Sequence, residues 1–361
     1  MRLIHVRSDD IVGEQWRLLL RFSYDRNVST AMCELGHAAP AADTLALVTG
    51  AVRQAHAYFD AAALAPLDIA PLLLYYGATN LLGAVNVLRS GDASLPIQHH
   101  GMRLDPPTPH AEIGDTSFIT RDANHGALGA LAKLASAPLV ARPGVKWTLR
   151  EVLATIPNIG DHFDWPYKEH PQAVVAVYPA RREHETVDRI RVADFGKRDP
   201  LTVLAAVPRF REAYLRPYDG HEWIVLFRRR AGIDLCEYSF MGQRYLNLGL
   251  PKGRHVLSLP QAVSFFMALY VLGTLSRYHS AVWHPFVRTD KTGERGAVER
   301  FVETARRLVP RLALELLYDA RWLFDSRPAE DEDSREHLVV EDVERIVRQE
   351  RRLLDEEYWN E

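Results

Sequence analysis

Residues 71–89 read PLLLYYGATNLLGAVNVLR, and this stretch is apolar on both faces of a helix. Such a helix is buried on all sides, so the sequence predicts a core helix here. Asp68 is expected to cap its start, Pro71 to lie in its first turn, and Gly91 to end it. Small residues such as Gly77 would let a neighbouring helix approach closely.

A second apolar stretch, closer to the C-terminus, predicts the partner of this helix. Residues 257–283 read LSLPQAVSFFMALYVLGTLSRYHSAVW. Ser258 and Gln261 have the spacing of a capping box, and the helix is expected to end near Pro285. Polar residues interrupt both stretches, so we expect buried helices and no membrane span. The two helices are expected to share one core that contains Leu74, Leu81, Val85, Phe265, Leu269 and Leu272.

Between the two stretches the hydrophobic period changes from helical to alternating. Strands of a mainly antiparallel sheet, interrupted by a helix near 200–206, are expected at residues 173–179, 188–193, 222–227, 235–240 and 245–249. The predicted fold class is therefore α+β and predominantly helical. A helical N-terminal part (1–150) and a helical C-terminal part (257–361) would pack into a bundle-like core, with the β-rich middle segment (151–256) laid on it.

Further elements are expected around this frame. We expect an opening strand at residues 1–6, a short strand at 117–120, and helices ending near 20 and at 40–63, 125–136 and 148–156. Residues 293–308 and 311–324 are expected to form one helix broken around Pro310, or two helices. After a charged linker at 329–336, residues 338–358 are expected to form an amphipathic helix that docks within the chain or in a dimer.

The composition narrows the class of partner. The 361 residues carry 44 Lys and Arg against 47 Asp and Glu, a net charge of −3. Sequence-blind nucleic-acid binders usually carry a basic excess, so this balance argues against that class. Only six basic residues are lysines, which is typical of a GC-rich genome or of a demand for bidentate guanidinium contacts. Cys33 and Cys236 form no CxxC pair and the N-terminus has no apolar segment, so a cytoplasmic protein is expected.

Signature motifs of common enzyme classes are absent from the sequence. It contains no G-x-S-x-G, no P-loop, no G-x-G-x-x-G and no H-E-x-x-H. Strands and helices are segregated along the chain, which argues against a doubly wound α/β enzyme. No cofactor and no tightly bound zinc are expected.

Histidine offers the most chemistry, with 15 copies. His99 and His100 lie in a loop rich in proline and glycine, where they could bind a ligand, hold a metal or act as a general base. The alternative interpretation is a pair of turn residues bonded to backbone. A second polar and aromatic patch, within residues 161–170, is expected to be a surface loop.

A third cluster, RYHSAVWH, closes the second apolar helix. Arg277 and His284 are seven residues apart, so on one continuous helix they would share a face. An R-x(4–6)-H pair is typical of HEPN-type ribonucleases, in which arginine stabilises the scissile phosphate and histidine transfers a proton. Such pairs are no more frequent in this sequence than chance predicts. The structural alternative is that Arg277 binds the last helix carbonyls while Trp283 packs beneath the turn. His279 and Trp283 are further candidates for ligand binding.

Several of these motifs together resemble the YaaC-like family of bacterial proteins. They are the Leu-Tyr-Tyr-Gly helix start, the His-Gly loop, the Leu-x-x-Ile-Pro helix and the Arg-Tyr-x-x-x-x-Trp ending, in that order between about residues 40 and 320. The resemblance implies a helix-rich fold and an intracellular location, but no mechanism. The Tyr-Tyr helix is also similar to HEPN helical bundles, although here Tyr278 directly follows Arg277 and a β-rich segment divides the helical halves.

The sequence thus leaves open whether the protein is an enzyme. The favoured function is an interaction or accessory component without catalysis, with a homo-oligomer or a protein partner expected and no membrane. One alternative is a metal-independent HEPN-type ribonuclease in a toxin or anti-phage setting, with Arg277 and His284 as catalytic residues and RNA as partner. The other is a nucleotide or small-molecule binder that uses His99 and His100.

Overall fold

The computed structural model describes residues 2–93, 99–108, 112–121, 126–168, 170, 172–179, 187–192, 214–217, 223–228, 236–240 and 242–325. The helix expected near 200–206, the linker at 329–336 and the helix expected at 338–358 lie outside these residues. Within them the fold is α+β and predominantly helical, as the sequence predicts.

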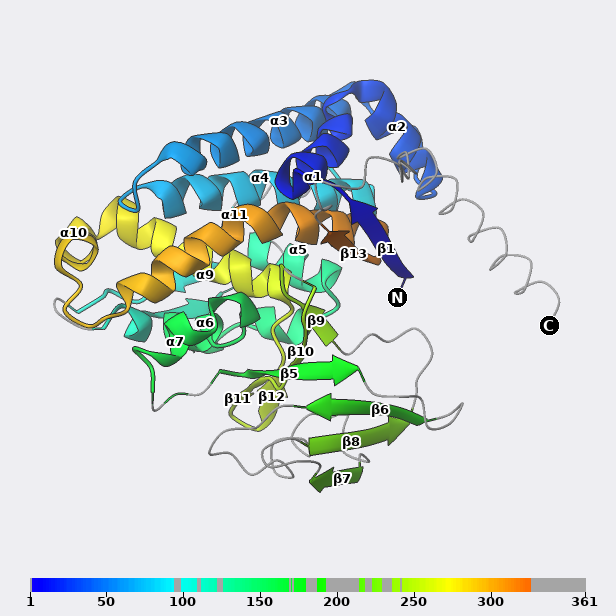
Figure 1. Cartoon of the computed structure of the whole chain (residues 1–361). Helices are drawn as coiled ribbons and strands as arrows, with labels where there is room; N and C mark the ends of the chain where they lie inside the picture. Colours follow the sequence, from blue (N-terminus) through cyan, green and yellow to red (C-terminus); the bar gives the residue numbers. More distant parts are fainter. Residues whose placement is uncertain are drawn as a thin grey trace.

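Long helices from both ends of the chain build the core. They are α3 (Ala42–Leu64), α4 (Ala70–Ser90), α9 (Gln261–Tyr278) and α11 (Arg295–Tyr318). Figure 1 shows α3 and α4 side by side, with α11 and α9 beneath them, and α4 contacts each of the other three. Shorter helices surround this core: α1 (Ile11–Leu20), α2 (Asp25–Glu34), α5 (Ala127–Leu134), α6 (Leu149–Leu153), α7 (Asp161–Asp164) and α10 (Ser280–Thr289).

Glycines bring α4 close to its neighbours on two sides. A Cβ atom on Gly77 would lie 2.6 Å from the ring of Phe59 on α3. On the other side, a Cβ on Gly273 of α9 would lie 3.2 Å from the Cβ of Tyr75. The expectation that small residues permit close helix packing is therefore confirmed at Gly77. The six predicted core residues are all buried, none more than 2% exposed, in one hydrophobic cluster.

The ends of α4 match the sequence signals except at the N-cap. Pro71 lies in the first turn, and Gly91 ends the helix with φ +70°, a left-handed conformation that favours glycine. The N-cap residue is Ile69, so the expected capping role of Asp68 is wrong. By length and composition α4 could cross a membrane, but most of its apolar stretch is buried against other helices.

The middle of the chain forms an antiparallel sheet on one side of the helices (Figure 1). Its strand order is β7 (Tyr214–Pro217), β8 (Trp223–Arg228), β6 (Val187–Val192), β5 (Val174–Pro179), β10 (Arg244–Asn247) and β9 (Cys236–Tyr238). The five expected strands are present with shifts at their ends, whereas β7 was not predicted. Smaller antiparallel sheets join β2 (Met102–Leu104), β3 (Ser117–Thr120) and β4 (Lys146–Thr148), and β11 (Leu250–Lys252) with β12 (His255–Leu257).

The opening strand finds a partner from the far end of the described chain. β1 (Arg2–Arg7) pairs in parallel with β13 (Ala320–Asp325). The residues of β13 were expected to continue a helix. That helix instead ends at Tyr318, because Asp319 takes a left-handed conformation with φ +48°. α11 passes through Pro310 as one helix, which settles the open question of one helix or two.

The start of α9 also differs from the expectation. Its N-cap residue is Pro260, and no side chain caps the helix, so the capping box expected from Ser258 and Gln261 is wrong. The Gln261 amide instead donates to the carbonyl of Tyr238, over 3.1 Å. This bond ties α9 to the end of β9.

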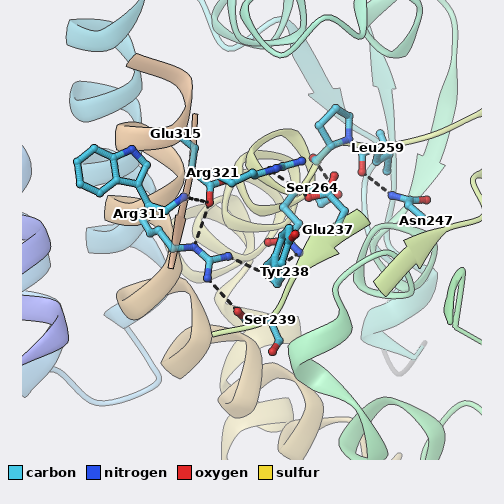
Figure 2. Close-up of polar contacts among 12 residues, drawn as sticks. Glu237, Tyr238, Ser239, Asn247, Leu259, Ser264, Arg311, Glu315 and Arg321 are labelled. Carbon is cyan, nitrogen blue, oxygen red and sulfur yellow. Dashed lines mark hydrogen bonds and ion pairs between the residues drawn. The ribbon is translucent and has the colours of Figure 1, made fainter. Parts of the chain in front are cut away.

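A buried ionic network provides the stronger tie between helices and sheet (Figure 2). Arg311 of α11 is 2% exposed and donates to the carbonyls of Ser239 and Tyr238, over 2.9 and 2.8 Å. Glu315 accepts from Arg321 over 2.9 Å, and its other oxygen lies 3.5 Å from Arg311 Nε. Desolvation lowers the pKa of Arg311, and the charge of Glu315 opposes that shift. The network joins α11, β13 and the end of β9.

Candidate functional site

Motifs that are far apart in the sequence meet at one end of α4. Tyr75 and Tyr76 come from α4, His100 from the loop before β2, and Tyr270 and Arg277 from α9. We call these five residues the Tyr–His–Arg cluster. Residues of the Leu-Tyr-Tyr-Gly, His-Gly and Arg-Tyr motifs, which are far apart in the sequence, thus lie next to one another in the fold.

At the base of the cluster, a buried tyrosine holds a histidine. Tyr75 is 4% exposed, and its hydroxyl hydrogen-bonds to Nδ1 of His100. Burial raises the pKa of the Tyr75 phenol far above its usual range, so the hydroxyl keeps its proton. Desolvation, followed by the charges of His99 and Arg277, lowers the pKa of His100. The neutral form of His100 is therefore favoured near pH 7, and its Nδ1 is engaged by Tyr75.

Aromatic packing fixes the plane of the His100 ring. Its centroid lies 5.3 Å from that of Tyr75 and 5.5 Å from that of Tyr270. The Tyr270 hydroxyl donates to the carbonyl of Met102 over 3.1 Å, which anchors the start of β2. The ring of His100 is thus held between two side chains whose own positions are fixed by the core.

The backbone of the His-His-Gly turn explains why glycine follows the histidines. Gly101 has φ +77°, and a Cβ on Gly126 would lie 2.5 Å from the Cα of Gly101. The carbonyls of His99 and His100 accept from the first amides of α5, over 3.0 and 3.2 Å. His99 Nδ1 accepts from the Gly101 amide over 3.2 Å. The predicted turn with backbone bonds is therefore present, and the same turn presents His100 to the cluster.

Arg277 lies at the exposed side of the cluster. Its guanidinium donates to the hydroxyl of Tyr76 and lies 5.8 Å from the centre of the Tyr76 ring and 4.9 Å from that of Tyr278. Among the described residues, no carboxylate forms an ion pair with Arg277. The structural alternative, in which Arg277 binds the last carbonyls of its helix, is wrong. Among the described residues, the guanidinium donates to the Tyr76 hydroxyl and to no carbonyl.

Arg277 and His284 do not share a helix face. α9 ends at Tyr278, His279 takes a non-helical conformation, and His284 belongs to α10. The prediction of one continuous helix through both residues is therefore wrong. α10 also continues through Pro285, where the helix was expected to end.

Asp68 holds the corner between α9 and α10. Its carbonyl accepts from Ser276 Oγ over 2.5 Å and from Trp283 Nε1 over 2.9 Å. Its carboxylate lies 3.3 Å from Nδ1 of His284. Because Ser276 and Trp283 bind one oxygen, their chain neighbours Arg277 and His284 lie at the same corner. The sequence suggested a cap for Asp68, and no local signal indicated this long-range role.

The remaining candidate residues from the sequence do not belong to the Tyr–His–Arg cluster. Trp283 is fully buried and packs against Phe286, so it is not placed to contact a ligand. The carbonyl of His279 accepts from two amides of α10, and within the described residues its ring forms no hydrogen bond or ring contact with the cluster. The second patch is exposed at Trp165, which is 72% exposed with Lys168 over its ring, but its first residues form α7 and are not the expected loop. Among the described residues, no group of three or more His, Cys, Asp or Glu could hold a metal ion.

A comparison with protein-family models decides the family. The model of the YaaC-like proteins matches residues 43–317, which is most of the chain. The chain belongs to the YaaC-like family. All five residues of the cluster lie within the matched region of this YaaC-like protein. No curated protein and no solved structure matches it, and the similarity to HEPN-type bundles finds no support in these comparisons.

Proposed function

We propose that this YaaC-like protein is a non-catalytic accessory component that binds a small molecule through a phosphate group at the Tyr–His–Arg cluster. The observation that carries the proposal is the position of Arg277. Its guanidinium is exposed, packed near the rings of Tyr76 and Tyr278, and unpaired with any carboxylate in the described part of the chain. An arginine held in this way is preorganised for an oxyanion.

The donors of the cluster suit a phosphate. One guanidinium nitrogen of Arg277 donates to the Tyr76 hydroxyl, and the N–H groups that this bond does not use remain for a ligand. Arginine binds carboxylate and phosphate alike through two oxygens. A phosphate has a further oxygen, outside the pair that binds the guanidinium, that can accept from Nε2 of His100, and a carboxylate has no such third oxygen.

The state of His100 favours binding over catalysis. A general base needs an unprotonated ring nitrogen that faces the reacting group. Nδ1 of His100 is engaged by the Tyr75 hydroxyl, which leaves Nε2 as the ring nitrogen for a ligand. We assign the proton to Nε2, and in that state His100 donates to a ligand and does not take a proton from it.

Calorimetry on the full chain tests this proposal. The probes are inorganic phosphate, adenosine 5′-monophosphate and acetate. We expect both phosphate compounds to bind more tightly than acetate, and Arg277→Ala to weaken their binding by about tenfold or more, as for loss of a charge-assisted hydrogen bond.

The control variant is Arg26→Ala. Arg26 is exposed on α2, which lies far from α10 in Figure 1, and its loss should leave binding unchanged. Equal binding of acetate and phosphate, or wild-type affinity in Arg277→Ala, would contradict the proposal.

A ribonuclease is the second candidate, and the Asp68–His284 pair favours it. A carboxylate at Nδ1 places the proton there and leaves Nε2 of the 54% exposed His284 as an acceptor, the arrangement of a general base. Arg277 lies at the same corner. The test is cleavage of single-stranded RNA in EDTA: cleavage that His284→Ala abolishes would replace the binding proposal with this one, and we expect none.

A further inference from the structure

A hollow on another side of the helical core contains charges that the first site does not use. It has a volume of about 440 Å³ and lies where the start of α1, the C-terminal half of α3, the middle of α11 and Phe240, which follows β9, meet. Ligand sites commonly have volumes of ~300–1,000 Å³ and lie where parts of a fold join.

Opposite charges face each other across this hollow. Asp9 and Asp10 precede α1 and Asp60 is on α3, whereas Arg306 and Arg307 are on α11. Although all five line one hollow, no ion pair joins these aspartates to these arginines in the described part of the chain. Charges of opposite sign that face each other without pairing are complementary to a guest that carries both signs.

Two of these groups have local partners, because Asp10 caps α1 through the Gly13 amide and Arg307 pairs with Glu303 over 3.0 Å. Asp60 lies 3.3 Å from the His56 ring, and its side chain is still 65% exposed. Asp9 and Arg306 have no partner among the described residues. Asp60 and Arg306 are on the two long helices that line the hollow, so we take them as the groups that bind an ammonium and a carboxylate.

The apolar lining suits a guest with a large apolar body. The rings of Trp16, Phe59 and Phe240 line the hollow, and Trp16 and Phe59 pack edge to face with centroids 5.2 Å apart. Arg307 lies 5.2 Å from the centre of the Phe240 ring, which fixes that wall. An aromatic or long aliphatic side chain placed here would contact these rings.

We infer that this hollow is a second ligand site, which binds a free amino acid with a large apolar side chain. Asp60 accepts from its ammonium group, Arg306 donates to its carboxylate, and the rings contact its side chain. The inference does not depend on the proposed phosphate site, which is built from different residues.

Calorimetry with L-phenylalanine on the full chain tests the inference. Two analogues, 2-phenylethylamine and 3-phenylpropionate, each lack one of the charged groups. We expect L-phenylalanine to bind about tenfold or more tightly than either analogue, because each missing charge removes a charge-assisted hydrogen bond. Asp60→Asn and Arg306→Ala should each weaken L-phenylalanine binding by a similar factor.

Further variants separate this site from other causes. Ala63 is exposed and lines the hollow, so Ala63→Trp should fill it and abolish binding without changing a charge. Arg26→Ala and Arg277→Ala should bind L-phenylalanine like the wild type. No binding, equal binding of an analogue, or full binding in Ala63→Trp would overturn the inference, whatever the result with phosphate.

Discussion

Two arginines of the helical core, Arg311 and Arg277, show opposite uses of the same side chain. Arg311 is buried, bonds to two carbonyls at the end of β9 and faces Glu315 (Figure 2). Arg277 is exposed, packs on tyrosine rings and has a phenol as its only hydrogen-bond partner among the described residues. A buried guanidinium must have its partners within the fold. An exposed one without an acidic partner is free to bind an external group.

Arg311→Ala is expected to have the largest effect on stability. It leaves Glu315 as a buried carboxylate that has lost one of two cationic partners, and it removes one of the two donors to each of the carbonyls of Tyr238 and Ser239. Breaking a buried ion pair in this way costs about 3–5 kcal/mol. Chemical denaturation should show this loss. Arg307→Ala, an exposed arginine on the same helix, should change the free energy of unfolding by less than about 0.5 kcal/mol. Similar losses of stability in the two variants would contradict the distinction between a buried and an exposed arginine.

Gln15 is a buried polar side chain that, unlike Arg311, has no hydrogen-bond partner within the described fold. It is fully buried on α1, and neither its amide nitrogen nor its oxygen has a hydrogen-bond partner in the described structure. Gln15→Leu keeps most of the volume and removes the unsatisfied groups, so it should stabilise the protein by about 1–2 kcal/mol. Thermal melts should show a higher Tm than for Gln54→Leu, at an exposed position of α3. A lower Tm in Gln15→Leu would show that its amide is satisfied.

The pH dependence of stability tests the state of His100 and should give the smallest effect. Because the pKa of His100 is lower in the folded chain, the unfolded chain binds this proton more readily. His100 therefore destabilises the fold as the pH falls through the ordinary histidine range, and this loss is absent at neutral pH. His100→Asn should lose less stability between pH 7 and pH 5 than the wild type. An unchanged pH profile would contradict a neutral His100.

How much the sequence predicts depends on whether the cause is local. The all-apolar pattern around Leu74 and Leu269 predicts the core helices, because burial on every face leaves a signal along the chain itself. The alternating pattern predicts most of the large sheet. The end of α9 at Tyr278 has no such signal, since the break depends on Asp68, which is about two hundred positions away in the chain.

The candidate site, like the fold, was predictable only where the signal is local in the sequence. The motifs indicated Arg277 and His100 as candidates, because Arg277 begins an R-x(4–6)-H pair and His100 belongs to a histidine pair in a loop rich in proline and glycine. Their interaction was not predictable, since the Tyr75–His100 bond and the Tyr76–Arg277 bond form only when α4, α9 and the His-His-Gly turn meet. The predicted pairing of Arg277 with His284 assumed one helix and failed for that reason.

The central claim, that Arg277 serves a ligand and not the fold, is tested most directly by measuring unfolding with and without adenosine 5′-monophosphate. A ligand that binds only the folded state raises the free energy of unfolding as its concentration exceeds its Kd. We predict that Arg277→Ala has wild-type stability without the nucleotide and gains none when it is added, whereas the wild type gains stability. A variant that is unstable without nucleotide, or that gains as much stability as the wild type, would contradict the claim.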